Sequence, residues 1–226
     1  MAVKDEHKRK GHTPFYRFCY VVTWLVFHSL SPVRYHGGKA LNRMAGPYLL
    51  ICNHQSMLDP FIPALGLPAR ELTFLGKKEL TRNRLLRWAV TKLHMIPVDR
   101  HAMDMEAMRA CARALRNGEI LLIFPEGTRH KPGIMADLES GTAMLALRSG
   151  VPLVPVLVLP KLRLFRRTEC WYGRPIPTAD LKEQGVNRET CDLLTRRITD
   201  TYAQMAAEPE KYLFTENDLP DAGEKV

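Results

Sequence analysis

A histidine and an aspartate stand five positions apart in "NHQSMLD", directly after the apolar run "PYLLIC". His54 and Asp59 are residue types that can serve as a general base and the carboxylate that orients it. On a continuous helix, five residues turn through about 500°, which leaves the two side chains roughly 140° apart. The pair can therefore meet only where the chain bends, and Pro60 favours a bend. Asp59 is also predicted to cap a helix that begins at Pro60. The alternative is that Asp59 only caps this helix and His54 is a loop residue.

A second polar stretch, "FPEGTRH", follows another apolar run at 124–130. Gly127 permits close approach of a ligand to the backbone, Thr128 adds a hydroxyl, and Arg129 carries a forked cation suited to phosphate. Glu126 can support a guanidinium or bind a substrate hydroxyl. The same residues also fit a charged turn with an internal Glu126–Arg129 pair.

Arg100 is a second arginine that follows a predicted strand. Two arginines at one sheet edge indicate a phosphate site more strongly than either alone. The same stretch, "HMIPVDR", contains a second pair with a five-residue separation, His94 and Asp99. On a strand, residues an odd number apart face opposite ways. The sequence therefore favours neither a shared site for this pair nor a metal centre, and we expect no metal and no cofactor.

Strand and helix patterns alternate along the chain, with short links between them. This alternation predicts an α/β fold with a mostly parallel central sheet flanked by helices. Ligands bind such sheets beyond the carboxyl ends of the strands, where "NH", "DR" and "PEGTR" all emerge. The predicted strands cover 48–52, 71–78, 94–100, 119–124 and 151–160, and the predicted helices 60–67, 83–93, 104–118, 136–150 and 188–207.

The 226 residues carry a net charge of +9, which favours a polyanionic partner: nucleic acid, an anionic membrane or a phosphorylated substrate. Nucleic acid is the weakest of the three, because base-stacking aromatic residues and a helix-turn-helix pattern are missing. The five cysteines are scattered, which argues against a disulfide framework and a structural zinc site and fits a reducing compartment.

The N-terminal region, residues 1–38, combines a basic head with the apolar run Phe18–Leu30. As a helix this run spans about 20 Å, short of the ~30 Å hydrocarbon core, so we expect a helix at the membrane surface or one packed on the domain. The α/β domain is predicted over 39–207, and residues 208–226 form an acidic, frayed tail. "KLRLFRR", Lys161–Arg167, alternates cations with apolar residues and fits either anionic headgroups or a solvated strand end.

Four pieces, "NHQSMLD", "IPVDR", "FPEGTR" and "VPLVPV", stand in this order. Together they resemble the four motifs of the glycerolipid acyltransferases, in particular the PlsC-type 1-acylglycerol-3-phosphate (lysophosphatidate) acyltransferases. The resemblance implies transfer of a fatty acyl group from acyl-CoA or acyl carrier protein to the sn-2 hydroxyl of 1-acylglycerol 3-phosphate, which gives phosphatidic acid. It also implies a location on the cytoplasmic face of a membrane.

The resemblance also implies roles for individual residues. His54 is the general base, with Asp59 behind it, and Pro155 shapes the wall of the acyl-donor pocket. Glu126 contacts the substrate or orders an arginine. The glycerol phosphate is held by Arg100, Gly127, Thr128 and Arg129.

The chain departs from the family at two positions. His94 stands where the family often has a glycine, and Glu139 stands where a basic residue often precedes the glycine of the next helix, here Gly141. Other functions stay open: an acyltransferase for glycerol 3-phosphate, another lysophospholipid or a lyso-ornithine lipid, or a non-catalytic basic protein that binds membranes. The chain has no G-x-S-x-G nucleophile motif, so we expect direct attack of the substrate hydroxyl on the thioester.

Overall fold

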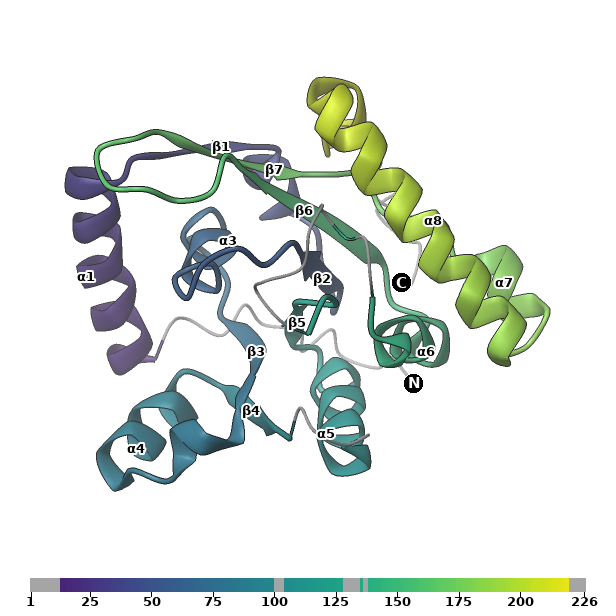
Figure 1. The fold of residues 1–226 in the computed structure, drawn as a ribbon, viewed down its shortest axis with the longest axis horizontal. Coiled ribbons are helices and arrows are strands. Elements are labelled where there is room, and N and C mark those ends of the chain that lie inside the picture. The colour runs from purple at the N-terminus through teal and green to yellow at the C-terminus, as the bar shows by residue number, and fades with distance from the viewer. Residues whose placement is uncertain (1–12, 100–103, 128–134, 136–137, 220–226) are drawn as a thin grey trace, which may run out of the picture.

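The computed structural model describes residues 13–99, 104–127, 135 and 138–219. Its centre is a seven-stranded sheet in the order β1-β7-β6-β2-β5-β3-β4, seen in Figure 1. All neighbouring strands are parallel except β6 and β7. The predicted α/β fold with a mostly parallel sheet is therefore confirmed. The strands are β1 (Val33–His36), β2 (Leu49–Cys52), β3 (Leu72–Lys77), β4 (Met95–Val98), β5 (Ile120–Ile123), β6 (Leu153–Leu159) and β7 (Thr168–Tyr172).

The central strands are uninterrupted apolar runs because helices cover both faces of the sheet. β2 reads "LLIC" and β5 reads "ILLI", and all eight residues are buried. Leu49 lies opposite Leu121 on one side and Leu153 on the other, which fixes the register of the three central strands. The polar residues that follow these strands are thus held at one edge of a rigid platform.

Two hydrophobic cores lie on the two faces of the sheet. One core joins Ile51 to the helices α5, α6, α7 and α8, and the other joins Leu50 to α1, α2 and α3. In Figure 1, α8 and α1 stand on opposite sides of the molecule. The helices are α1 (Pro14–Leu30), α2 (Gly38–Leu41), α3 (Phe61–Leu65), α4 (Arg84–Lys92), α5 (Met105–Arg116), α6 (Ser140–Ser149), α7 (Ala179–Glu183) and α8 (Arg188–Ala207).

The structure corrects several predicted boundaries. The connector before β2 contains β1 and α2, so the sheet begins before residue 39. The helix predicted from residue 136 begins only at Ser140, because Glu139 is extended. The tail is not frayed up to residue 219: Phe214 is buried, and its N–H donates to the Tyr172 carbonyl at 2.9 Å. The segment docks through this buried ring together with backbone bonds and the ion pairs Arg43–Glu216 and Arg174–Asp218.

α1 begins at Pro14, four residues before the predicted apolar run. Proline suits the first helical turn because that turn needs no N–H from it. Within the part of the chain that the structure describes, no helix is both long enough and apolar enough to cross a membrane. One side of α1 packs on the domain through Tyr16 and Phe27, which are both buried.

His94 is not part of β4 but precedes it in a left-handed turn with φ 59°. Glycine adopts this conformation at little cost, which gives a physical reason for the glycine that the resemblance leads us to expect here. In this chain the imidazole Nε2 lies 2.8 Å from the Glu71 carboxylate. That contact helps to offset the strain of a side chain at this position.

Candidate active site

The site begins where β2 ends, at a buried asparagine. The Asn53 side chain donates from Nδ2 to the Val158 carbonyl at 3.0 Å and accepts from the Val158 N–H at 2.8 Å. The side chain thus continues the hydrogen bonding between β2 and β6 for one more residue while the backbone turns away. This clamp sets the direction in which His54 leaves the sheet.

His54 and Asp59 meet, as the sequence predicts. His54 Nδ1 lies 3.0 Å from Asp59 Oδ2, and the two side chains are only 7% and 2% exposed. A carboxylate can only accept hydrogen bonds, so Nδ1 donates its proton and the lone pair lies on Nε2. A pairing of this kind fixes the tautomer that can take a proton from a substrate.

The bend between them is a turn closed by the aspartate. Asp59 Oδ2 also accepts from the backbone N–H groups of Gln55 and Ser56, at 2.5 and 2.6 Å. The prediction that Asp59 caps the following helix is wrong: α3 begins at Phe61, its N-cap is Pro60, and it has no side-chain cap. The carboxylate faces back into the turn because the N–H groups and the imidazole are there.

Glu126 holds the other side of the histidine. Its Oε1 accepts from the His54 backbone N–H at 2.9 Å, and the residue is only 3% exposed. The Phe124 ring packs on the imidazole, with ring centroids 4.4 Å apart. The two polar stretches singled out in the sequence therefore form one cluster across β2 and β5. Nε2 makes no hydrogen bond to any residue in the described ranges, so it is available to a ligand.

Cys52 lies next to the cluster but is no nucleophile. Burial, reinforced by Cys170 and by the carboxylates of Asp59 and Glu126, raises the pKa of its thiol well above the ordinary value. The thiol is therefore neutral near pH 7, and the thiolate is the reactive form. The Ser56 hydroxyl accepts from the Leu58 N–H at 3.3 Å, so it serves the turn.

The residues that the resemblance assigns to phosphate binding are described only in part. Gly127 has φ 66°, which favours glycine, and a Cβ there would lie 2.9 Å from Glu139 Oε1, so any other residue would also displace that side chain. Asp99 follows β4. The strands β5 and β3 lie between β4 and β2, so β4 is roughly 14 Å from β2 at the usual strand spacing. Arg100, Thr128 and Arg129 lie outside the described residues, and their roles stay predictions.

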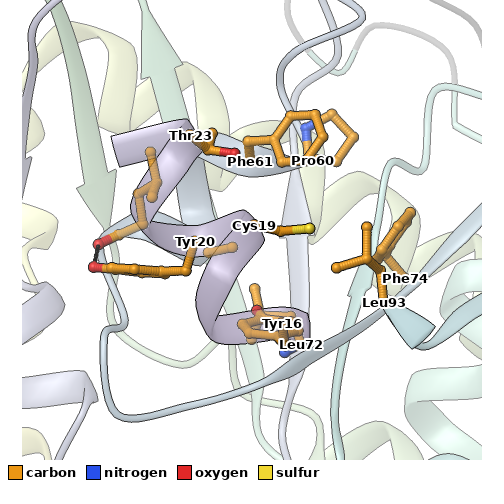
Figure 2. A pocket seen from close by; sticks show the side chains of 11 residues that line it. Tyr16, Cys19, Tyr20, Thr23, Pro60, Phe61, Leu72, Phe74 and Leu93 are labelled. Carbon is orange, nitrogen blue, oxygen red and sulfur yellow. Dashed lines mark hydrogen bonds between the residues drawn. The ribbon is translucent and has the colours of Figure 1, made fainter. Parts of the chain in front are cut away.

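An apolar groove runs between α1, α3 and the start of β3, with a volume of about 470 Å³ including its open side. Pro60 and Phe61 lie at one end, directly after Asp59, and Tyr16 and Leu72 lie at the other, as Figure 2 shows. The Tyr16 hydroxyl accepts from the Leu72 N–H, and burial raises its pKa to about 12. The hydroxyl thus stays neutral. The groove is lined by Tyr16, Cys19, Tyr20, Thr23, Pro60, Phe61, Ala64, Leu65, Leu72, Phe74 and Leu93.

Comparison with known proteins matches the sequence model of the Acyltransferase family to residues 32–159, more than half of the chain. The chain belongs to the Acyltransferase family. It is similar to two enzymes named 1-acyl-sn-glycerol-3-phosphate acyltransferase. The one from Streptococcus pneumoniae is 25% identical over 210 residues, which cover 90% of this chain and 77% of that protein. The one from Bacillus subtilis is 27% identical over 140 residues, 62% of this chain and 69% of that protein.

The fold of this acyltransferase is also that of a solved relative. The crystal structure of the 1-acyl-sn-glycerophosphate acyltransferase PlsC from Thermotoga maritima superimposes with a TM-score of 0.59 at 23% identity. The match covers 86% of this chain and 76% of that one. The resemblance drawn from four short motifs is confirmed by these matches. His54, Asp59 and Glu126 all lie within the matched residues 32–159.

Other features of the acyltransferase site were missed by sequence reasoning. Neither the Asn53 clamp nor the bond from Glu126 to the His54 N–H was predicted, because each depends on a partner far along the chain. Tyr202 of α8 was missed as well: its hydroxyl donates to the Ile51 carbonyl at 2.5 Å, three residues before His54. Pro155 is buried in β6, and its carbonyl accepts from Gly173 N–H at 2.8 Å; its role in a donor pocket stays a prediction.

Among the described residues, no group of three or more histidine, cysteine, aspartate or glutamate side chains could hold a metal ion. All five cysteines are free.

Proposed function

We propose that this acyltransferase transfers a fatty acyl group from an acyl thioester to the sn-2 hydroxyl of 1-acylglycerol 3-phosphate, giving phosphatidic acid. The substrate follows from the names of its relatives in Streptococcus and Bacillus. The chemistry rests on one observation: a buried imidazole whose Nδ1 is paired with a carboxylate at 3.0 Å. Acyl-CoA and acyl carrier protein both fit as the donor.

His54 acts as the base in this proposal. Its Nε2 takes the proton of the acceptor hydroxyl as the oxygen attacks the thioester carbonyl carbon. The Asp59 carboxylate stabilises the imidazolium that forms, and the Glu126 bond to the His54 N–H keeps the ring in place. The tetrahedral intermediate then collapses: the C–S bond breaks, and the leaving thiolate takes the proton back from Nε2. No covalent enzyme intermediate and no cofactor enter the scheme.

The phosphate of the acceptor is bound by the "EGTR" turn and Arg100 in this scheme. The left-handed Gly127 supports the role of the turn, because backbone N–H groups can approach an anion closely where no Cβ intervenes. Guanidinium groups suit phosphate because they offer several donors in a plane.

An acyl chain occupies the groove beneath α1. Its lining is apolar apart from Thr23 and two tyrosine hydroxyls. The Tyr20 hydroxyl is hydrogen-bonded to the backbone of α3 and the Tyr16 hydroxyl to the backbone of β3. One end adjoins Asp59, so a chain that lies in the groove has its carbonyl end near His54.

The outer side of α1 contacts the membrane from which the lysolipid comes. Phe18 is 64% exposed, and Leu25 is 52% exposed on the same side of the helix. Solvent-exposed apolar side chains on one side of a helix are typical of helices that lie in the membrane interface. The side of the membrane stays a prediction.

The test uses purified protein, a radiolabelled acyl thioester and a panel of acceptors, with the products separated by chromatography. We expect labelled phosphatidic acid from 1-acylglycerol 3-phosphate and at most slow transfer to glycerol 3-phosphate, other lysophospholipids or lyso-ornithine lipid. Rapid transfer only to an acceptor without phosphate would contradict the proposed substrate.

A further inference from the structure

A second apolar patch lies on α4, apart from the groove and from the turn of residues 53–59 that carries His54 and Asp59, here called the catalytic turn. Leu85 is 75% exposed and Trp88 is 50% exposed. Residues three apart are neighbours on a helix, so the two side chains share its outward side. The Asn83 side chain accepts from the N–H groups of Leu85 and Leu86 at 2.9 and 3.0 Å. The patch therefore sits on a capped first turn of the helix.

α4 and the loop 161–167 stand at opposite ends of α1. At its N-terminal end, Phe15 makes an edge-on contact with Trp88, with ring centroids 4.8 Å apart. At the C-terminal end, the Leu30 carbonyl accepts from the Phe165 N–H at 2.6 Å, and Phe165 itself is 79% exposed. In Figure 1 all three segments lie along one side of the molecule, with α4 below α1 and the loop above it.

The charges on these three segments are of one sign. The stretches 14–30, 82–92 and 160–168 contain no aspartate and no glutamate. Arg84 and Arg87 flank the α4 patch and are exposed, and neither forms an ion pair with a carboxylate in the ranges that the structure describes. The cations of the two outer segments are Arg82, Arg84, Arg87 and Lys92 on the α4 side, and Lys161, Arg163, Arg166 and Arg167 in the loop.

We propose that α4 is a second membrane-contact element, which inserts Leu85 and Trp88 into an anionic bilayer while Arg84 and Arg87 bind lipid headgroups. With the loop 161–167 at the other end, contact at both ends of α1 fixes the orientation of the domain on the membrane. The inference rests on the proposed membrane contact of α1 and goes beyond it, since α1 alone leaves the domain free to rotate about the helix axis.

An anionic bilayer fits this surface better than a second copy of the chain. In a two-fold dimer the patch would face itself or another part of the same side, and these segments offer only cations. Like charges placed opposite each other oppose association, whereas anionic headgroups attract each lysine or arginine near the surface. Tryptophan and leucine beside arginine are also the residues that interfacial helices use.

Binding of the full-length protein to vesicles tests the proposal, measured by flotation without substrates. For phosphatidylglycerol vesicles at low salt, we expect the double variant Arg84→Gln/Arg87→Gln to bind about 30-fold more weakly, at roughly fivefold for each charge. Leu85→Ser should weaken binding about tenfold. The matched controls lie on α8, across the molecule: Leu193→Ser, and Arg188→Gln with Arg196→Gln, should bind as the wild type does.

Trp88 reports its own insertion. In the variant Trp24→Phe/Trp171→Phe it is the only tryptophan left of three. Its emission should shift to shorter wavelength on phosphatidylglycerol vesicles and be quenched by brominated lipid, with little change on phosphatidylcholine. If this variant does not fold, the loss of quenching in Trp88→Phe gives the same information. If the emission wavelength and intensity of Trp88 did not change when vesicles were added, the proposal would be overturned.

Three further outcomes separate this proposal from the proposed reaction and from a dimer interface. If α4 variants bind vesicles as the wild type does while phosphatidic acid still forms, the α4 proposal fails and the proposed reaction stands. If no acceptor is acylated in detergent but vesicle binding depends on Leu85 and the arginines, the proposed reaction fails and the α4 surface stands. A dimer in light scattering that Leu85→Ser converts to monomer would assign the patch to a second copy and overturn the proposal.

Discussion

The catalytic turn and the helix α1 both lie next to the groove, yet different kinds of interaction hold them in place. In the turn, one buried oxygen of Asp59 accepts three hydrogen bonds, and Asn53 and Glu126 secure the backbone on either side. α1 packs mainly through apolar surface, supplemented by hydrogen bonds of the Tyr16 and Tyr20 hydroxyls to the domain, and it leaves its outer side exposed. A buried polar turn tolerates few arrangements, because each unpaired donor costs about 1–3 kcal/mol. Apolar packing is non-directional and tolerates more.

This difference separates two kinds of effect. Changes in the turn should lower the rate for every substrate, because they move the base itself. Changes on the groove side of α1 should alter which acyl chain is used, because they change a volume. The experiments below sharpen or break that distinction.

Asp59→Ala should have the largest effect. It leaves the Gln55 and Ser56 N–H groups without their acceptor and the imidazole without its partner. We expect kcat to fall about 10³-fold and the free energy of unfolding to fall by about 2 kcal/mol. Steady-state kinetics and urea unfolding measure the two changes.

The control for Asp59 is a second histidine–carboxylate pair with the same distance between nitrogen and oxygen. His36 Nε2 lies 3.0 Å from Glu169 between the edge strand β1 and its neighbour β7. Glu169→Ala should leave kcat unchanged. An equal loss of activity in both variants would mean that the Asp59 effect is general destabilisation.

Arg100→Ala and Arg129→Ala should each raise KM about 10–100-fold for an acceptor that carries phosphate, because a charge-assisted hydrogen bond is lost. The values of kcat should change much less, since neither residue touches the base in this scheme. Kinetics with a matched acceptor that lacks phosphate provide the comparison. An equal rise in KM for that acceptor would refute the assignment.

Glu126→Gln should have a smaller effect, a loss of about tenfold in kcat. The amide oxygen can still accept from the His54 N–H, but without the negative charge that strengthens the bond. Activity should recover little with higher acceptor concentration, because the residue positions the base rather than the substrate. A rise in KM with no change in kcat would instead indicate that Glu126 contacts the substrate.

Thr23→Phe should have the smallest effect on rate and the clearest effect on selectivity. The side chain lines the groove, so a ring there shortens the space for the acyl chain. We expect kcat/KM to fall roughly tenfold for the longest chains and little for short ones. The control is Val22→Phe, the same ring on the next residue, whose side chain is 43% exposed. If both variants showed the same preference among chain lengths, the proposal that the acyl chain binds in the groove would be wrong.

Local sequence signals account for much of the fold and for the central pair of the site. Uninterrupted apolar runs located β2, β5 and β6, and helical periodicity located α4, α5 and α8 close to their observed ends. The pairing of His54 with Asp59 could be proposed in advance because Pro60 favours a bend in the residues 53–59 that follow the strand. The short edge strand β1 and the docked tail near Phe214 were missed, since both depend on pairing with the β7 region.

The rest of the site depends on distant partners. Asn53 is 105 residues from Val158, and His54 is 72 residues from Glu126. No local pattern indicates which buried polar group will satisfy which other. Glu126 illustrates the point: its motif suggested a substrate or arginine contact, which stays a prediction, and the structure adds a bond to the histidine backbone that no motif indicated.

The most direct test of the account is turnover by purified His54→Ala, with labelled acyl thioester and 1-acylglycerol 3-phosphate. Circular dichroism and thermal unfolding should match those of the wild type, while transfer falls by about 10²–10⁴-fold. A folded His54→Ala protein that forms phosphatidic acid at the wild-type rate would contradict the central claim that this imidazole removes the proton from the acceptor hydroxyl.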